Sequence, residues 1–237
     1  MKQRLDLDMV RRGLVASRSE AENWIRLGKV TVNGNVAARP GQFIDQTYDV
    51  KLAATERYVS RAGLKLASVA SRFNVVFTDA TVLDVGSSTG GFTDYALQHG
   101  AKKVYAVDVG TDQLHRSLHG HPKIELHEKT DIRDFTPDTP IDIVVIDVSF
   151  ISIRDILPHV ATLSHPKTAI LAMVKPQFEA GRNQINKGVI KNDSTRREIL
   201  RDFEQWSKKL FVIVDKADSD VHGAKGNQER FYHMNIL

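Results

Sequence analysis

The chain of 237 residues contains no cysteine. Without thiols it can form neither a disulfide framework nor a thiolate metal site, and no covalent mechanism through a cysteine nucleophile is open to it. The nine histidines follow no spacing typical of metal ligands, so we expect no bound metal. A chain without disulfides suits a reducing compartment, and we predict a cytoplasmic protein.

Long apolar runs are also absent. The strongest run, at residues 168–174, is far shorter than the roughly 20 residues that a membrane-spanning helix needs. The first residues, MKQRLD, carry acids and no apolar stretch, so they do not read as a signal peptide. We therefore expect no membrane partner.

The net charge is only +4, but it is unevenly distributed. Residues 1–60 hold 10 Lys and Arg against 7 Asp and Glu, whereas the remaining residues hold 23 against 22. A basic segment of this kind is typical of a surface that meets nucleic acid. The alternative is an ordinary solvated face.

Residues 1–57 are predicted to form a small α+β domain of two short helices and a hairpin. Apolar residues at positions 21, 24 and 25 fall on one helical face. Val30 and Val32 alternate with polar residues and lead into Asn33-Gly34, the strongest short signal for a two-residue hairpin. We place the domain boundary near residues 51–57, which leaves residues 58–237 for the second domain.

The second domain alternates predicted strands and helices. Strands are expected at residues 81–84, 103–107, 141–146, 169–174, 211–215 and 230–236, and the clearest helices at 61–73, 152–163 and 194–209. Such alternation predicts an α/β fold around a mostly parallel, Rossmann-like sheet. Only a loop separates the last two strands, so we expect them to pair antiparallel.

A loop of small residues follows the first strand of this sheet. The segment DVGSSTGGF at 84–92 joins the strand to a helix, which builds a ligand cradle at the carboxyl edge. Ser88 stands where a dinucleotide fingerprint requires glycine. The next strand ends at Asp108, whose carboxylate can accept from a ribose diol. This combination fits S-adenosylmethionine better than NAD, and a generic strand-to-helix turn is the alternative.

Four polar residues are predicted to meet at the same edge. Asp147 and Lys175 each follow a strand. Glu229 precedes the last strand, which runs backwards, and Lys65 lies near the start of the helix that feeds the first strand. Each alone is typical of a surface charge or a structural ion pair. Together, beside a cofactor loop, they predict a catalytic site.

Several motifs then resemble one family. They are YVSRAGLKL at 58–66, DVGSSTGGFT at 84–93, YAVDVG at 105–110, DVSFIS at 147–152, VKPQFEAG at 174–181 and GNQE at 226–229. Together they resemble the TlyA family, often labelled hemolysin A. Its members are ribosomal-RNA 2′-O-methyltransferases, with cytidine as the implied nucleotide. They join an FtsJ-like methyltransferase domain to an N-terminal RNA-binding domain of the type first seen in ribosomal protein S-four.

The resemblance assigns roles to residues of this chain, with S-adenosyl-L-methionine as cofactor and ribosomal RNA in ribosomal subunits as partner. The implied catalytic residues are Lys65, Asp147, Lys175 and Glu229. The implied cofactor residues are Asp84, Gly86, Ser87, Ser88, Thr89, Gly90, Phe92, Asp108 and Asp131. The implied RNA contacts are Arg4, Arg11, Arg12, Arg18, Arg26 and Lys29. Three departures from the family pattern are Asp131, where Asn is more usual, Ala62, which replaces a Gly, and the segment VHGAK at 221–225, which replaces a Pro-containing segment before GNQE.

The residue types suit methyl transfer to a hydroxyl, which needs in-line positioning and removal of the hydroxyl proton. We predict that Lys175 faces the ribose 2′-hydroxyl. A nearby Lys65 favours a neutral lysine that acts as base, whereas the carboxylates of Asp147 and Glu229 favour a charged lysine that orients the nucleophile or stabilises the alkoxide. Both roles stay open at this stage.

Two other classes of protein remain as alternatives. A non-catalytic RNA-binding protein with a methyltransferase fold would lack cofactor binding. A hemolysin would match the family's label, although the sequence has no spanning segment and no long amphipathic stripe. Cofactor binding and red-cell lysis distinguish these alternatives from the enzyme.

Overall fold

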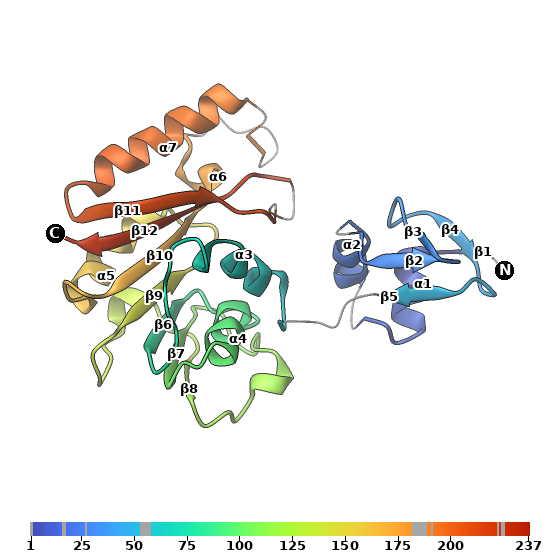
Figure 1. Ribbon diagram of the computed structural model, residues 1–237, viewed down its shortest axis with the longest axis horizontal. Coiled ribbons are helices and arrows are strands. Elements are labelled where there is room, and N and C mark those ends of the chain that lie inside the picture. Colours follow the sequence, from blue (N-terminus) through green and yellow to red (C-terminus); the bar gives the residue numbers. More distant parts are fainter. Residues whose placement is uncertain are drawn as a thin grey trace. The chain divides into compact units, whose positions relative to one another are not determined.

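The computed structural model describes residues 2–15, 18–26, 28–52, 58–181, 189–190, 192–221, 223 and 226–237. The chain divides into two compact units, residues 1–57 and 58–237, each with its own apolar core (Figure 1). The boundary expected near residues 51–57 falls mostly on residues 53–57, which lie outside the described part of the chain.

The N-terminal unit packs two helices against short strands. Its elements are β1 (Lys2–Arg4), α1 (Leu5–Arg11), α2 (Arg18–Arg26), β2 (Val30–Val32), β3 (Asn35–Val36), β4 (Phe43–Asp45) and β5 (Val50–Leu52). Strand β1 pairs with β4, and β2 lies between β3 and β5. The core between helices and strands includes Leu5, Met9, Ala21, Ile25 and Val30.

The hairpin predicted at Asn33-Gly34 is confirmed. Val32 pairs with Asn35 across the turn, and Asn33 and Gly34 have φ values of 49° and 81°. A two-residue turn of this hand needs positive φ at both positions, which explains the Asn-Gly pair. Strands β1, β4 and β5 escape prediction because each has only three residues and, unlike β2 and β3, none flanks an Asn-Gly turn.

The C-terminal unit alternates strands and helices along most of its length. Its helices are α3 (Arg61–Ala70), α4 (Gly91–Gln98), α5 (Leu157–Leu163), α6 (Pro176–Glu179) and α7 (Asp193–Ser207), with short 3-10 turns η1 (Arg116–Leu118), η2 (Ile132–Asp134) and η3 (Ile153–Asp155). Its strands are β6 (Thr81–Val85), β7 (Lys103–Val107), β8 (Ile124–His127), β9 (Ile143–Ile146), β10 (Ala169–Val174), β11 (Phe211–Asp218) and β12 (Arg230–Ile236). The segment predicted as one helix at 152–163 is therefore split into η3 and α5.

These strands form one seven-stranded sheet in the order β11-β12-β10-β9-β6-β7-β8. The five strands from β10 to β8 are parallel, and β12 pairs antiparallel with both β10 and β11. The predicted Rossmann-like sheet and its antiparallel end are confirmed. Edge strand β8 was not predicted.

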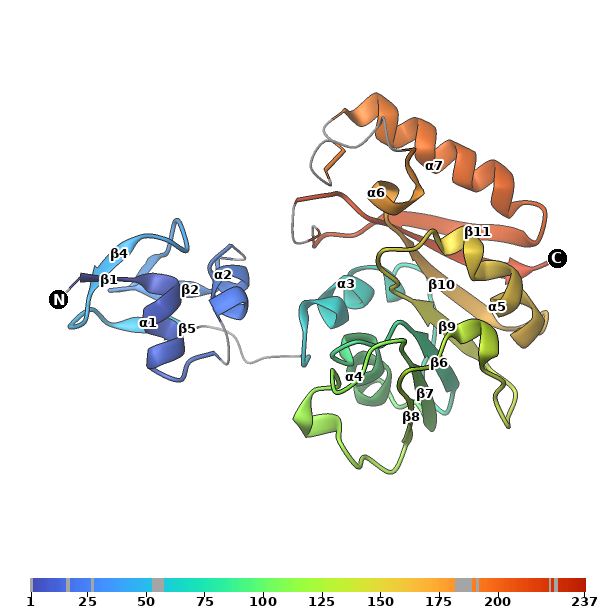
Figure 2. The same ribbon diagram turned by 180° about the vertical axis from the view of Figure 1, so that it is seen from behind.

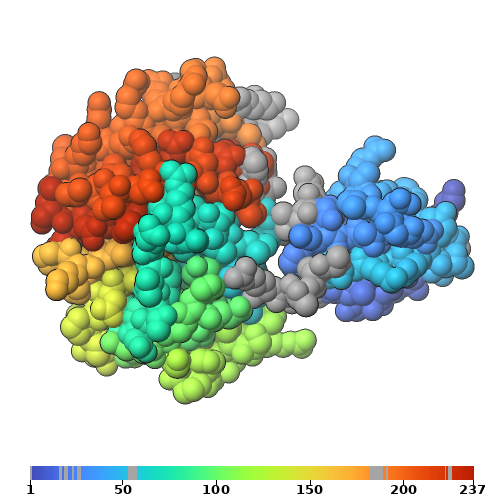
Figure 3. Space-filling view, in the orientation of Figure 1, coloured from blue at the N-terminus to red at the C-terminus, as the bar shows by residue number. Residues whose placement is uncertain are grey.

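Helices cover both faces of the sheet (Figures 1 and 2). On one face, Leu66 of α3 and Phe92 of α4 pack with Val82 of β6. On the other face, Leu157 of α5 and Phe203 of α7 pack with strand residues that alternate with the first set. In the space-filling view, the teal segment that includes α3 lies between the green segment around α4 and the red C-terminal strands (Figure 3).

Candidate active site

The loop between β6 and α4 requires glycine at its first position. Gly86 has φ +80°, and a Cβ built on it would lie 2.9 Å from the carbonyl oxygen of Asp147 and 3.2 Å from Cγ1 of Val148. A side chain there would push apart the loops that follow β6 and β9. The glycine therefore lets the predicted cofactor loop lie directly against the loop that carries Asp147.

Asp108 directly follows β7 and closes the other side of the cofactor loop. Its Oδ2 accepts a hydrogen bond from the backbone N–H of Ser88 at 2.8 Å, and its Oδ1 accepts from the backbone N–H of Gly110 at 2.7 Å. Carboxylate oxygens have capacity for further donors. The geometry is compatible with two vicinal hydroxyls, so the ribose-binding role of Asp108 stays a prediction.

A pocket of about 410 Å³ opens between the ends of β6, β7 and β9. The predicted cofactor residues that line it are Gly86, Ser88, Asp108 and Asp131. The others lie within or beneath the loop and do not line it: Asp84, Ser87, Thr89, Gly90 and Phe92. Residues not singled out from the sequence complete the lining, among them Gln113, Ile132, Ser149 and Phe150.

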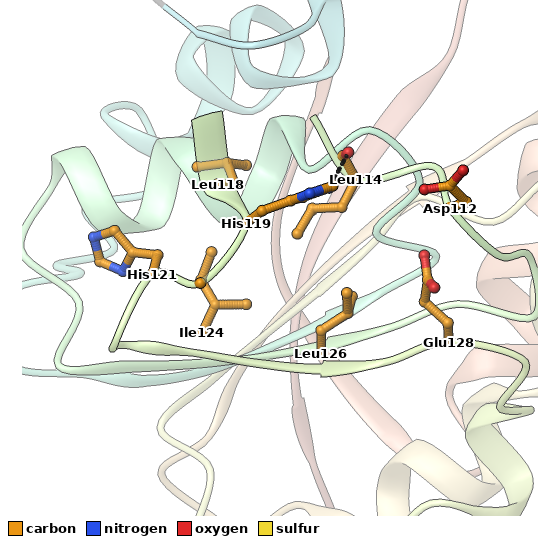
Figure 4. A pocket seen from close by; sticks show the side chains of 9 residues that line it. Asp112, Leu114, Leu118, His119, His121, Ile124, Leu126 and Glu128 are labelled. Atoms are coloured by element: carbon orange, nitrogen blue, oxygen red, sulfur yellow. Dashed lines mark hydrogen bonds between the residues drawn. The ribbon is translucent and has the colours of Figure 1, made fainter. Parts of the chain in front are cut away.

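A smaller pocket of about 170 Å³ lies over β8, beside the segment that contains η1 (Figure 4). Leu114 and Leu118 line one side, and Ile124 and Leu126 line the other. The same two leucines fill the space beside Gly90, where a Cβ would lie 2.7 and 2.6 Å from their methyl groups. Small-molecule sites usually exceed about 300 Å³. We therefore take the larger pocket as the candidate cofactor site.

Asp84 lies inside β6, below the cofactor loop, and is fully buried. Its Oδ2 accepts a hydrogen bond from the hydroxyl of Thr93 in α4 at 2.6 Å. Burial raises the pKa of Asp84 to about 7, and the nearby carboxylates of Asp147 and Asp108 act in the same direction. The described contacts of Asp84 join β6 to the start of α4, so it supports the loop from beneath.

Asp131 lines the pocket at the start of η2 and is bonded to Arg133. The guanidinium donates from Nε at 2.9 Å and from Nη2 at 2.6 Å, and the Arg133 backbone N–H donates at 2.9 Å. These bonds lower the pKa of Asp131 to about 2. Because this chain has Asp where the family usually has Asn, the predicted adenine contact is a carboxylate bonded to Arg133. An ionised carboxylate can only accept hydrogen bonds, whereas an amide could also donate them.

The four predicted catalytic residues form two cation–carboxylate pairs. Lys175 Nζ lies 2.6 Å from Asp147 Oδ1 and donates to Ser149 Oγ at 2.7 Å. Lys65 Nζ donates to Glu229 Oε2 at 2.5 Å. Asp147, Lys175 and Glu229 stand at the ends of the neighbouring strands β9, β10 and β12. The topology thus brings the four residues to one edge of the sheet.

The backbone around Glu229 is held by a charged cluster at the ends of β11 and β12. Asp218 accepts from Arg230 Nε at 2.6 Å and from Arg196 Nη2 of α7 at 2.5 Å. The carbonyl oxygen of Glu229 accepts from the backbone N–H of Ser219 at 3.0 Å. These hydrogen bonds stabilise the start of β12, next to Glu229. Residues 222, 224 and 225 of the preceding segment lie outside the described residues.

Phe150 is a site residue to which sequence reasoning gave no role. Its side chain is 91% exposed, at the mouth of the larger pocket, and its ring centroid lies 5.4 Å from that of Phe178. Its φ of +68° is uncommon for any residue other than glycine. The motif DVSFIS contains it, but neither exposure nor backbone hand can be read from those letters.

Four of the six predicted RNA contacts donate hydrogen bonds to two aspartates of α1. Asp6 is fully buried and accepts from Arg4 and Arg18, and Asp8 is fully buried and accepts from Arg11 and Arg12. The guanidinium of Arg12 also donates to the carbonyl oxygens of Tyr48 and Gln46, at 3.0 Å each. Its donors are therefore largely used within the fold.

The other two predicted RNA contacts stand apart from this arrangement. Lys29 is exposed, and the side chain of Arg26 lies outside the described residues.

Among described residues, no cluster of His, Cys, Asp and Glu could hold a metal ion. No helix in the described part of the chain is long and apolar enough to cross a membrane.

The mostly parallel sheet and the small-residue loop at its carboxyl edge are typical of a Rossmann-like methyltransferase. The family model of FtsJ-like methyltransferases matches residues 58–236, and that of the S4 domain matches residues 3–50. The chain belongs to the TlyA family, which joins these two domains, as its sequence motifs predict.

Relatives of known name cover nearly the whole chain. The 16S/23S rRNA (cytidine-2′-O)-methyltransferase TlyA of Mycobacterium tuberculosis is 35% identical over 96% of this chain and 88% of its own. Hemolysin A of Brachyspira hyodysenteriae is 38% identical over 98% of this chain and 100% of its own. A protein from Streptococcus thermophilus whose name describes it as a hemolysin has a solved structure and is 37% identical to this chain. The two structures align with a TM-score of 0.78 over 100% of this chain and 89% of that one.

Proposed function

We propose that this protein transfers a methyl group from S-adenosylmethionine to a ribose 2′-hydroxyl, on cytidine, in ribosomal RNA. The observation that carries the proposal is the Lys175–Asp147 pair, which stands at the ends of two neighbouring strands beside a pocket of about 410 Å³. The substrate follows from the relative in Mycobacterium tuberculosis, which is named for that reaction.

The larger pocket has the size and the polar groups to hold the cofactor, since ligand pockets usually measure about 300–1,000 Å³. Gly86 and Ser88 would form one wall of the cofactor site, Asp108 would accept from the ribose hydroxyls, and Asp131 would accept from the adenine amino group. The bound cofactor supplies an electrophilic methyl group on a sulfonium sulfur. The positive charge of that group suits a site that carries Asp108 and Asp147.

Lys175 orients the nucleophile. An ammonium has three N–H donors; Ser149 accepts one of them, and Asp147 Oδ1 lies 2.6 Å from the nitrogen as its ion-pair partner. The third donor can hold the ribose 2′-oxygen and stabilise the negative charge that develops there. The proton that the hydroxyl loses passes to the carboxylate of Asp147. The ion pair at 2.6 Å supports this charged form of Lys175 over the neutral base.

The second pair and the exposed aromatic ring complete the site. Lys65 and Glu229 are both buried, and their pairing adds no net charge to the catalytic edge. Phe150 offers an exposed ring on which an unstacked base can lie, because base–aromatic stacking tolerates any base.

The two units divide the work between RNA binding and chemistry. Residues 1–57 are the RNA-binding domain, where the exposed faces of Arg4, Arg11 and Arg18 meet phosphates. Residues 58–237 are the methyltransferase domain. The partner is then a ribosomal subunit or its RNA, and the protein works in the cytoplasm.

The direct test is to incubate the purified protein with S-adenosylmethionine and ribosomal subunits and to map modified nucleotides by mass spectrometry. We expect an added methyl group on the ribose of a specific cytidine. Binding of the cofactor without transfer to any ribosomal RNA would instead support the non-catalytic alternative. A methyl group found on a base would refute the ribose assignment.

A further inference from the structure

Glu179, at the end of α6, is a buried carboxylate that the proposed chemistry does not use. Its side chain is 2% exposed. Oε1 accepts from the backbone N–H of Ile153 at 2.8 Å, and Oε2 accepts from the hydroxyl of Ser152 at 2.6 Å. Arg154 Nε lies 3.3 Å from Oε2. Burial raises the pKa of Glu179 above its ordinary value, while these partners stabilise the charged form.

These contacts attach α6 to the loop that follows β9. Lys175 is the N-cap of α6 and contacts the first part of that loop, at Asp147 and Ser149. Glu179 lies four residues after Lys175, about one helical turn, and contacts the last part of the loop, at Ser152 and Ile153. The short helix therefore grips loop 147–153 at both ends.

Between these two ends the loop adopts an unfavourable conformation. Phe150 has φ +68°, and its exposed ring touches the protein at Phe178, which is itself part of α6. A non-glycine residue stays in that region only where its surroundings over-determine it. The loop ends, rather than Phe150 itself, have the buried hydrogen bonds that can impose the conformation.

Stability alone is a poor reason for an acid at position 179. Buried charged groups are often replaceable by well-packed apolar residues at no cost in stability. The two hydrogen-bond donors to Glu179, Ser152 and Ile153, lie within three residues of Phe150, and Ser149 in turn contacts Lys175. The two bonds of its carboxylate therefore act on the segment that holds the catalytic lysine.

We infer that Glu179 is a positioning residue that keeps loop 147–153 folded against Lys175, with Asp147, Ser149 and Phe150 in place for transfer. It does not touch the reacting atoms. The inference rests on the proposed function, since its consequence is measured as methyl transfer. Its structural half, the restraint of the loop, can be measured without activity.

The test compares Glu179→Ala and Glu179→Gln in the full chain, with Glu198→Ala on the exposed face of α7 as the control. Glu179→Ala should lower kcat about 10–100-fold, because small displacements of reacting groups cost factors of this size. The dissociation constant of S-adenosylmethionine and the KM for ribosomal subunits should change much less than kcat. Glu179→Gln keeps an oxygen acceptor for Ile153 and should recover most of the loss. Glu198→Ala should match the wild type.

Amide hydrogen exchange of the peptide at 147–156 supplies the readout that needs no activity. It should quicken in Glu179→Ala while exchange elsewhere in the C-terminal unit stays unchanged. Unchanged exchange in that peptide overturns the inference, as does a kcat within about twofold of wild type. Faster exchange throughout the unit would show a purely structural role and also overturn it. A wild-type protein that transfers no methyl group would refute the proposed function instead, and the exchange result would still decide the restraint.

Discussion

The N-terminal unit and the catalytic edge both set cations against buried carboxylates, but they differ in what they leave exposed. Asp6 and Asp8 are fully buried, while the side chain of Arg18, paired with Asp6, is 52% exposed. At the catalytic edge both partners are covered, and the side chain of Lys175 is only 10% exposed. One arrangement leaves its cations exposed to solvent, and the other covers them beside a pocket that Asp147 lines.

The difference explains how one chain can use cations for two purposes. An exposed guanidinium attracts any nearby phosphate, and salt weakens that attraction. A desolvated ammonium that is held by one hydrogen bond and one ion pair interacts strongly with one atom, at one place. The predictions below test whether exposure separates binding from chemistry in this way.

The largest effect should come from the covered pair. Lys175→Ala should lower kcat by about 10²–10³-fold, the usual cost of removing a donor that stabilises a developing negative charge. Asp147→Asn should act similarly, because the lysine loses its charged partner. Single-turnover methylation of ribosomal subunits measures both, with the exposed Lys209→Ala as control. Wild-type turnover in both variants would show that the covered pair has no part in the chemistry.

The two regions should also respond to pH in opposite directions. Burial raises the pKa of Asp84 to about 7, and the bond from Arg4 is the main cause that lowers the pKa of Asp6 to about 2. The ordinary value is about 4. The contribution of Asp84 to stability is therefore complete below pH ~4 and lost as pH rises through ~7. That of Asp6 is complete above pH ~4 and lost as pH falls towards ~2.

Urea unfolding at several pH values measures this contrast, because Trp24 and Trp206 report on different units. In the wild type, the unfolding free energy of the C-terminal unit should decrease on the order of a few kcal/mol between pH 5 and 8. In Asp84→Asn this decrease should be absent. An identical pH dependence in this variant and the wild type would contradict the assignment.

Asp108 is a carboxylate of the cofactor pocket whose partners are backbone amides rather than a cation. Asp108→Ala should weaken S-adenosylmethionine binding by about 1.5–3 kcal/mol, as expected for hydrogen bonds to a charged group. Calorimetry gives the affinity, and the exposed Asp134→Ala provides the control. A wild type that binds no S-adenosylmethionine would refute the proposed enzyme.

The smallest effect should separate two arginines of the N-terminal unit. Arg18→Ala should reduce the salt dependence of RNA binding by about one phosphate contact, evenly across RNA sequences. Arg12→Ala should leave that dependence unchanged and destabilise the unit by about 1–3 kcal/mol, because its donors serve Asp8, Gln46 and Tyr48. Equal salt dependence in Arg18→Ala and wild type would refute phosphate contact by Arg18.

Much of the fold follows from local sequence. The Asn33-Gly34 hairpin is fixed by two residues that tolerate positive φ, and β7 and β10 have the bounds that their apolar runs predict. Strand β8 was missed because four residues are too few for their apolar–polar alternation to stand out; among the described residues it pairs with β7 alone. Such a strand exists through tertiary contact rather than through its own pattern.

The candidate site was predictable in position but not in pairing. Strand direction alone brings Asp147, Lys175 and Glu229 to one edge. Which lysine meets which carboxylate depends on side-chain conformations, and the sequence gives no information on these. The orientation of the Asp131 carboxylate likewise depends on the hydrogen bonds that the Arg133 guanidinium donates to it. The exposure of Phe150 depends on a left-handed backbone conformation, which a residue other than glycine disfavours.

The tight crossing at Gly86 has a thermodynamic consequence. Since a Cβ at position 86 would lie 2.9 Å from the carbonyl oxygen of Asp147, the cofactor loop and the catalytic loop are in direct contact, and neither can move closer to the other. Any ligand that alters the free energy of one loop alters that of the other. Linkage then requires methyl donor and RNA to change each other's affinity by the same factor. Under the proposed function the two substrates are thus heterotropic ligands of a single element, and their coupling is reciprocal whatever its sign.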